Sequence, residues 1–553
     1  MTSTGVQLDD TGLSASRGSR WQALCEILLI FLVFFIHGAS PAPEVNEAHY
    51  LSKAKHYWNP QWCERDLFCS AADAHQVFYW TFGWLTLWLP LPAVAWIGRL
   101  LTWSLLAWAW RRLSVAVVPA RFAAVLSAGL FLTLLHRAHL AGEWVVGGVE
   151  AKGFAFVFGL LGIEAVVRNR WNRACLWLGA AAAFHVLVGG WLVVAAGLAW
   201  LVMRYGTDDK PPVPSPWALL AGGLLSLPGL IPAIMLMRGV DPSTAAEAAR
   251  IYVFERLPHH LVPQKFPAYF LARFTVLLMV WIALVWRQPL SGSRRRLTAM
   301  VNGSLLIAAA GLAISFATVV WGDQMAPLLR YYWFRTSDVL LPLGLGLMLT
   351  AFVVQKVNER SRMGVVWLTL AMLAVGGHLV SILRDRGPEP IAPADNKMQT
   401  ARDWRELCEW ASANTPSDAV FLTPRTACSF RWYSNRAEVA TWKDIPQDAA
   451  GIVAWWKRMC DVHHRTVRGK FAYWQSSLSS APPEELVRLG NKYNARYLIT
   501  ESSPPLPFEL VSPPNASYAI YRLPTTWETP TPPRQSVANE PSQNNPTRNP
   551  LAE

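Results

Sequence analysis

Two carboxylates follow the first apolar stretch of the chain almost at once, in the segment PAPEVNEAHYLSKAKHYWNPQW at residues 41–62. If this segment is helical, Glu47 and Tyr50 share one face, because residues three apart on a helix are neighbours. A carboxylate in a poorly hydrated site beside aromatic rings has a raised pKa and can act as a general base. Glu47 and Glu44 are therefore candidates for a general base. The alternative is that either carboxylate only caps the start of a helix.

A second group of charged residues lies in GEWVVGGVEAKGFAF, residues 142–156. Glu150 and Lys152 are two apart, so on a helix they point in different directions and need different partners. Together with Glu143 they are candidates for a substrate cavity, and Lys152 is also a candidate for binding a phosphate. The alternative is a helix cap followed by a lysine whose stem is buried while its amine reaches the membrane surface.

A third group lies in RYYWFRTSDVLLPLG, residues 330–344. Arginine side chains match phosphate oxygens in geometry and charge, so Arg330 and Arg335 are predicted to bind a phosphate. Arg335 and Asp338 are three apart, which is also the spacing of an ion pair that would only position the helix. Both interpretations stay open, and Asp338 is a further candidate for the cavity.

Histidines and one more carboxylate complete the predicted substrate cavity: His49, Asp66, His185, His259 and His260. Adjacent histidines such as His259 and His260 can indicate a metal site. No third ligand stands at a distinctive spacing from them, however. We therefore predict no metal site, and the sequence indicates no particular cofactor. It gives little support for a divalent metal.

The elements that position these residues are those of a membrane protein. Of 553 residues, 52% are hydrophobic and only 16% are charged, whereas about a quarter of a soluble protein is charged. A membrane span needs about 20 apolar residues. Eleven spans are predicted, with 174–204 folded into two short helices that turn at Gly189 and Gly190. They lie at 21–38, 78–110, 120–137, 153–168, 174–204, 217–238, 267–287, 297–321, 328–355 and 363–383.

Positive charge sets the expected orientation, since Arg and Lys accumulate in cytoplasmic loops. The N-terminal tail, 1–20, and the clusters RNRWNR (168–173) and SRRRL (293–297) are therefore placed in the cytoplasm. These loops account for the net charge of +13, which does not indicate nucleic acid. All the candidate side chains then face the outside. The long first outer loop, 39–77, is predicted to lay amphipathic helices along the membrane surface.

The region after the spans is predicted to be an extracytoplasmic α/β domain at 399–523, reached through a Pro-rich linker at 385–398. Helices are expected at 400–415 and 483–493, and strands at 419–424, 495–500 and, as an edge strand, 518–523. The Pro- and Asn-rich tail, 524–553, is expected to be disordered. An oxidising compartment would allow a disulfide bond to form between Cys63 and Cys69.

Together these positions resemble the GT-C class of membrane glycosyltransferases, which take sugars from polyprenyl-phosphate carriers. The resemblance lies in the acidic motif PEVNEAHYL in a long first outer loop, the helix pair around FHVLVGGW, a late arginine and a C-terminal soluble domain. It implies a GT-C-like domain at 21–384, a catalytic base at Glu47, and Arg330 or Arg335 on the lipid phosphate. The usual Asp-Glu pair of the class reads Asn46-Glu47 here, which puts a metal-assisted mechanism in doubt. GGVEAKGFAF, RYYWFRTSDVLLPLG and WKDIPQDA also look like an uncharacterised bacterial membrane family with the same architecture.

The expected function is transfer of a sugar from a polyprenyl-phosphate donor to an extracytoplasmic glycan, lipid or protein acceptor, in the inner membrane of a bacterium. The alternative is a catalytically silent relative that binds a lipid or glycan and serves as a scaffold of the cell envelope. A transporter fits less well. Transporters place polar groups near the midplane of broken helices, whereas these candidates gather at one face.

Overall fold

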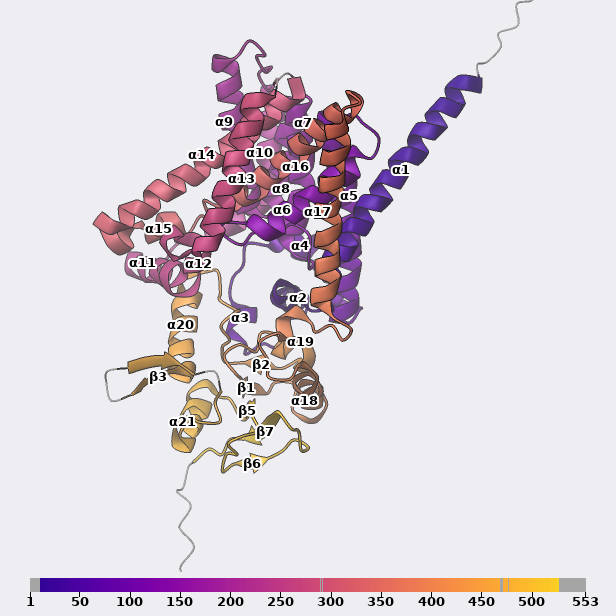
Figure 1. Cartoon of the computed structure of the whole chain (residues 1–553). Helices are drawn as coiled ribbons and strands as arrows, with labels where there is room; N and C mark the ends of the chain where they lie inside the picture. Colours follow the sequence, from indigo (N-terminus) through magenta and orange to yellow (C-terminus); the bar gives the residue numbers. More distant parts are fainter. Residues whose placement is uncertain (1–9, 289, 291, 468–470, 476, 527–553) are drawn as a thin grey trace, which may run out of the picture.

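The computed structural model describes residues 10–526 except 289, 291, 468–470 and 476. It has two parts, a bundle of apolar helices and a C-terminal α/β domain at one end of the bundle (Figure 1). The predicted disordered tail lies almost entirely outside the described residues, as does the beginning of the predicted cytoplasmic tail.

Each predicted span corresponds to a helix of the bundle. Within the described residues, eight helices are long and apolar enough to cross a membrane, namely α1, α5, α9, α10, α13, α14, α16 and α17. Helices α6, α7 and α8 have only 16, 17 and 14 residues. The protein is therefore a multi-pass helical membrane protein, as predicted. The bounds are α1 Asp10–Gly38, α5 Leu91–Val117, α6 Ala123–Ala138, α7 Ala151–Val167, α8 Trp171–Phe184, α9 Val186–Gly206, α10 Pro216–Met235, α13 Ala268–Arg287, α14 Gly292–Trp321, α16 Arg335–Asn358 and α17 Arg362–Arg386.

The turn between α8 and α9 lies at His185, so the predicted turn at Gly189 and Gly190 is wrong. His185 has extended backbone angles and ends α8, and its Nδ1 accepts a hydrogen bond from the Val188 N–H at 3.3 Å, which caps α9. Gly189 instead allows a close helix contact, because a Cβ there would lie 2.1 Å from the backbone nitrogen of Ala182. A Cβ at Gly190 would meet nothing within 4 Å. The glycine pair thus marks a packing contact one turn after the break.

The first loop is packed into the protein, and the predicted position of its helices along the membrane surface stays a prediction. It contains α2 Val45–Trp58, α3 Leu67–Ser70, α4 Gln76–Thr81 and the 3-10 helix η1 Gly83–Leu87. Leu51 of α2 and Phe78 of α4 are fully buried against Val94 of α5. The loop therefore runs on to Pro90, the N-cap of α5, and Pro92 lies in the first turn of that helix, which its fixed φ suits.

Two further loops bring short helices to the same end of the bundle. The first contains α11 Pro242–Arg250, the π-helix η2 Ile251–Arg256, α12 Pro258–Leu261 and the 3-10 helix η3 Pro263–Lys265. The second contains the 3-10 helix η4 Gly322–Met325 and α15 Ala326–Leu329. Leu329 of α15 packs in one buried cluster with Val253 and Leu261, so the two loops support each other.

The C-terminal domain is built on a five-stranded sheet with the order β2-β1-β5-β7-β6. Strands β1, β2 and β5 are parallel, and β7 is antiparallel to both of its neighbours. The predicted edge strand at 518–523 is therefore an inner strand, β7, and β6 is the edge. The elements are η5 Pro393–Asp395, α18 Ala401–Asn414, β1 Val420–Leu422, α19 Phe430–Ser434, β2 Ala437–Glu438, α20 Ala449–His463, the hairpin β3 His464–Val467 and β4 Phe471–Trp474, α21 Pro483–Tyr493, β5 Tyr497–Glu501, β6 Glu509–Leu510 and β7 Tyr518–Arg522. Cys63 and Cys69 are buried free thiols, so the disulfide left open above is absent.

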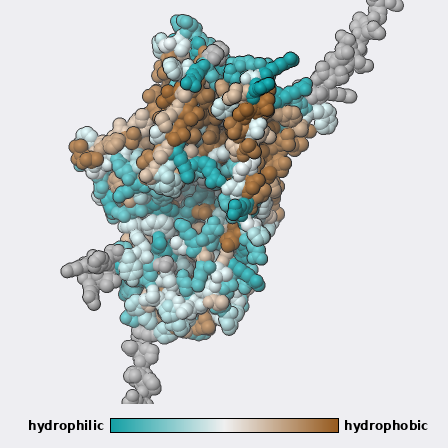
Figure 2. All heavy atoms as spheres, viewed as in Figure 1, coloured by the Kyte–Doolittle hydropathy of each residue, from teal (hydrophilic) through white to brown (hydrophobic). Residues whose placement is uncertain are grey.

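The domain docks on the loop helices of the bundle. Ile452 and Trp455 of α20 share a buried cluster with Ala248 and Ile251, and α19 and η5 contact α2. Figure 2 shows hydrophilic residues gathered where the apolar helices end and the domain begins. We call this region the junction.

Candidate functional site

Four charged side chains form a buried network at the junction, which we call the junction cluster: Glu143, Glu150, Lys152 and Arg335. Lys152 Nζ donates to Glu143 Oε1 at 2.6 Å and lies 3.3 Å from Glu150 Oε1. Arg335 Nε pairs with the other oxygen of Glu143. The structure thus brings together residues that were singled out separately in the sequence.

The loop between α6 and α7 is what positions Glu143 and Glu150. Asp338, one turn into α16, accepts hydrogen bonds from the backbone N–H groups of Leu140, Ala141 and Glu143 at 2.7, 2.8 and 3.3 Å. The ion pair between Arg335 and Asp338 that was left open above does not form, because each has a different partner. Asp338 therefore anchors the loop and Arg335 faces the cluster.

The two carboxylates of the cluster differ in their electrostatics. Burial would raise the pKa of Glu143, but Arg335 and Lys152 outweigh it and lower that pKa. Burial raises the pKa of Glu150, with Lys152 opposing it and Glu143 adding to it. Asn46 Nδ2 donates to Glu150 Oε2 at 2.9 Å, while Glu150 Oε1 accepts no hydrogen bond from any residue in the described part of the chain. Glu150, only 1% exposed, is the carboxyl group of the cluster that is best suited to exchange a proton.

Aromatic and histidine side chains border the cluster. The Tyr50 hydroxyl lies 3.4 Å from His75 Nε2, and the His75 ring is 5.0 Å from that of His185. Asp73 holds the other ring nitrogen of His75 at 3.0 Å. His185, a predicted cavity residue, interacts electrostatically with Arg335 and Lys152 of the cluster. His75 and Asp73 were missed, although they stand in the loop segment ADAHQVFYW.

Glu47 lies beside this region and forms a buried ion pair with Arg99 of α5. Arg99 Nε and Nη2 donate to the two carboxylate oxygens at 2.6 and 2.5 Å, and both side chains are 0% exposed. The N–H groups of Val149 and Glu44 also donate to Glu47, at 2.8 and 2.9 Å. No oxygen of Glu47 is left for a substrate, so this geometry favours a structural role over the predicted one. Arg99 was missed, yet a single arginine inside an apolar stretch indicates a buried acidic partner.

Glu44 occupies the N-cap position of α2, as the alternative to catalysis predicted. It forms a reciprocal capping box with Glu47, and its Oε1 accepts from the Ser40 hydroxyl at 2.5 Å. Burial raises its pKa. Its predicted second role as a base stays a prediction.

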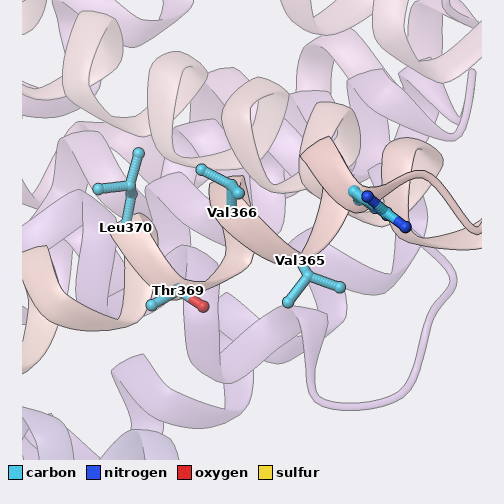
Figure 3. A pocket seen from close by; sticks show the side chains of 5 residues that line it. Val365, Val366, Thr369 and Leu370 are labelled. Carbon is cyan, nitrogen blue, oxygen red and sulfur yellow. The ribbon is translucent and has the colours of Figure 1, made fainter.

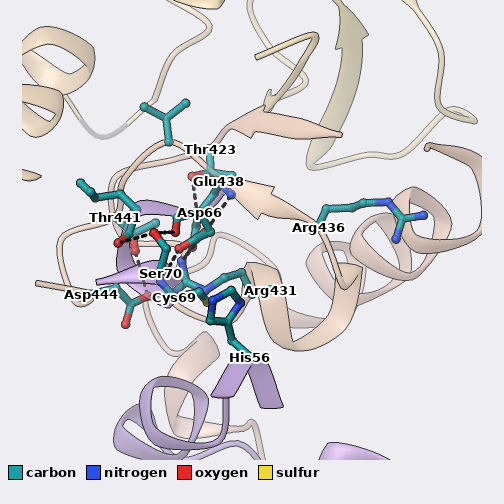
Figure 4. Close-up of polar contacts among 12 residues, drawn as sticks. His56, Asp66, Cys69, Ser70, Thr423, Arg431, Arg436, Glu438, Thr441 and Asp444 are labelled. Carbon is teal, nitrogen blue, oxygen red and sulfur yellow. Dashed lines mark hydrogen bonds and ion pairs between the residues drawn. The ribbon is translucent and has the colours of Figure 1, made fainter. Parts of the chain in front are cut away.

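His49 and Asp66 lie in a different network, centred on Arg431 of α19. Figure 4 shows Asp66 with Arg431, Glu438 and Asp444. Arg431 Nη1 donates to Asp66 at 3.0 Å and to Glu438 at 2.7 Å, and Nη2 pairs with Asp444. His49 Nδ1 lies 3.0 Å from Asp444. We call this set the Arg431 network. The adjoining cavity has a volume of only about 10 Å³, too small for a sugar, so these two residues connect the first loop to the domain.

The Arg431 network predicts a pH-dependent stability. Burial raises the pKa of Glu438 from its ordinary value of 4.5 to about 8, with Arg431 opposing it. The folded state thus holds the Glu438 proton more tightly than the unfolded state does. The stabilisation that this proton gives to the folded state is complete below pH 4.5 and is lost as pH rises through 8. Between pH 5 and 8 the unmodified protein should lose on the order of 2 kcal/mol of unfolding free energy through Glu438. Glu438→Gln, whose side chain stays neutral, should not show this loss. Unfolding temperatures of both proteins at the two pH values measure this.

His49 and Asp444 titrate in the opposite sense and serve as the internal reference. Burial lowers the pKa of His49. Burial would raise that of Asp444, but Arg431 and His49 lower it, so both groups favour the folded state more as pH rises. Both remain in the Glu438→Gln protein, so the difference between the proteins isolates Glu438. Equal changes in unfolding temperature for the two proteins would contradict the assignment.

The adjacent histidines do not build a metal site. His260 Nδ1 lies 2.5 Å from the carbonyl oxygen of Ala141, and the His259 ring is 4.1 Å from that of His260. Among residues 10–526, with the gaps given above, no three His, Cys, Asp or Glu side chains could hold a metal ion. His260 thus supports the loop that carries Glu143.

A groove of about 440 Å³ lies far from the junction, along the first turns of α17. It is lined by Arg362 and the mostly aliphatic side chains of Val365, Val366, Thr369 and Leu370, the last four of which are labelled in Figure 3. Few polar groups face it, so it suits an acyl chain better than a sugar.

Comparisons with known proteins give two results. The profile of a family described as a domain of unknown function (DUF6798) matches residues 402–462, a region that contains Arg431, Glu438 and Lys443. Among solved structures, the chain is similar to the archaeal oligosaccharyltransferase AglB from Archaeoglobus fulgidus in complex with an inhibitory peptide and a dolichol-phosphate. The identity is 11%, the match covers 87% of this chain and 70% of that chain, and the TM-score is 0.43. The chain matches no curated protein sequence.

Proposed function

We propose that this protein is a membrane glycosyltransferase that takes a sugar from a polyprenyl-phosphate donor. The observation that carries the proposal is the junction cluster itself, at the end of an apolar bundle. In it Glu150, a carboxyl group of raised pKa, contacts Lys152, and Lys152 and Arg335 both pair with Glu143. A lipid donor needs this combination, because its tail requires apolar helices while its phosphate requires cations at the level of the headgroups. The arginine-rich loops at the opposite end support a cytoplasmic N-terminus and an extracytoplasmic domain, in the inner membrane of a bacterium.

In this mechanism Lys152 and Arg335 hold the donor phosphate and Glu150 acts as the base. Glu150 Oε1 takes the proton of an acceptor hydroxyl as the oxygen attacks the anomeric carbon. The new carbon–oxygen bond forms as the bond to the phosphate oxygen breaks, so the configuration inverts. Lys152 and Arg335 stabilise the charge that develops on the leaving phosphate.

The test is Glu150→Gln in purified full-length protein, incubated with polyprenyl-phosphate sugars and a membrane extract as the source of acceptor. We expect release of polyprenyl phosphate to fall about 100-fold or more, because a positioned base contributes that much. Glu255→Gln, in η2, where the exposed Glu255 side chain pairs with Arg250, is the matched control and should keep full turnover.

A scaffold that binds lipid or glycan without turnover is the competing function. It is favoured by one observation, that both carboxylates of the junction cluster already have a cationic partner. The scaffold function would be supported, and the enzyme function rejected, if the unmodified and Glu150→Gln proteins bound the donor equally well and neither transferred sugar. Unchanged turnover in Glu150→Gln would remove Glu150 from the mechanism.

A further inference from the structure

Three cations at the junction have neutral oxygens as their partners. Arg256 Nε donates to the Trp442 carbonyl at 2.7 Å, Arg330 Nη2 to the Gln447 carbonyl at 2.7 Å, and Lys443 Nζ to Asn46 Oδ1 at 2.6 Å. None of the three forms an ion pair with a carboxylate in the part of the chain that the structure describes. This differs from the junction cluster, where two cations face two carboxylates.

Arg256 is buried and Arg330 and Lys443 are half-buried, so their unpaired charges are costly. Arg256 is only 8% exposed, and burial lowers its pKa. Burial also lowers the pKa of Lys443, to about 8, and the nearby charge of Arg256 adds to the effect. A buried cation without a counter-ion costs several kcal/mol unless something compensates it. Stacking compensates part, since Arg256 lies 5.5 Å from the Trp442 ring and Arg330 lies 5.0 Å from the Tyr252 ring.

One loop of the C-terminal domain connects all three cations to the rest of the junction. Residues 442–447 supply Lys443 itself and the carbonyl partners of the two arginines. Lys443 reaches the junction cluster through Asn46, whose amide donates to Glu150. The side chain of Gln447 also contacts His75 at 2.9 Å. The loop therefore completes the junction from the side of the domain.

We propose that Arg256, Arg330 and Lys443 form a second anion subsite, made jointly by the bundle and the domain, for a phosphate group carried by a substrate of the junction cluster. This proposal rests on the proposed function. Phosphate oxygens are stronger acceptors for guanidinium and ammonium groups than the neutral oxygens now in place. Two sources supply this chemistry: the second phosphate of a diphosphate-linked donor, or a phosphate on the acceptor.

The experiment measures binding of inorganic phosphate and pyrophosphate to the purified full-length protein by calorimetry. Lys443→Met should weaken pyrophosphate binding about tenfold or more, as expected for the loss of one charge-assisted contact. Lys443→Arg should retain most of the affinity. Lys492→Met removes an equal charge from the domain, where Lys492 pairs with Asp461, and should bind as the unmodified protein does. Equal affinities in Lys443→Met and the unmodified protein, or no saturable binding at all, would overturn the proposal.

Lipid probes distinguish the two sources. If the donor carries both phosphates, Lys443→Met should weaken polyprenyl diphosphate binding about tenfold and leave polyprenyl monophosphate binding unchanged. If the acceptor carries the phosphate, both lipids should bind this variant normally while inorganic phosphate binds less well. Anion binding that depends on Lys443 in a protein that transfers no sugar would retain the subsite and reject the proposed function.

Discussion

Arg431→Met is expected to lower the free energy of unfolding of the docked C-terminal domain by about 3–5 kcal/mol, because removing one member of a buried ion network leaves the others uncompensated. Asp66, Glu438 and Asp444 all face this guanidinium, and all are 1% exposed. Glu438 already holds a proton below about pH 8. Without Arg431, the two remaining carboxylates must also bind protons, or the first loop must separate from the domain. Hydrogen exchange of the backbone at 430–447 and at 63–70 measures the separation.

Arg402→Met is the matched control for this change. Arg402 lies on α18 and pairs with Glu406, and both side chains are exposed to solvent. An exposed pair of this kind contributes only about 0.2–1 kcal/mol. Exchange rates at 430–447 should therefore stay at the unmodified level in Arg402→Met. If Arg431→Met leaves them unchanged as well, the Arg431 network does not hold the loop to the domain.

The helices of the bundle could be predicted because each is encoded locally. A run of about 20 apolar residues forms a membrane-spanning helix because only a helix satisfies all its backbone hydrogen bonds within the run. Basic loops separate most of these runs. The break at His185 could not be placed from composition, because Gly189 and Gly190 give the same signal whether they form a turn or a close packing contact. The contact of Gly189 with Ala182 depends on how α8 folds back on α9.

Some of the residues singled out in the sequence meet at the junction, although their pairings were not predicted and their roles stay predictions. Glu143, Glu150, Lys152 and Arg335 were expected on one face, and they do meet at the junction. The prediction that Glu150 and Lys152 need different partners is wrong, because Glu150 precedes α7 and Lys152 contacts both Glu143 and Glu150. The pair of Arg335 with Glu143 could not be predicted from spacing, because the two residues are far apart in the chain. Lys443 reaches Asn46 across 397 residues. Strand β7 was predicted to be an edge strand because the strand that covers its outer side, β6, has only two residues and leaves no recognisable pattern in the sequence.

Glu47→Gln is expected to destabilise the bundle by about 3–5 kcal/mol, since it leaves the buried Arg99 without a counter-ion. A catalytic base would behave differently, because an isosteric amide would then keep the fold and remove only turnover. The double variant Glu47→Gln, Arg99→Met separates the two cases, as it removes both charges and should be more stable than either single variant. Thermal unfolding of the three proteins, followed by the fluorescence of the buried tryptophans, measures the coupling. A Glu47→Gln protein that unfolds at the unmodified temperature but no longer transfers sugar would return the catalytic role to Glu47 and take it from Glu150.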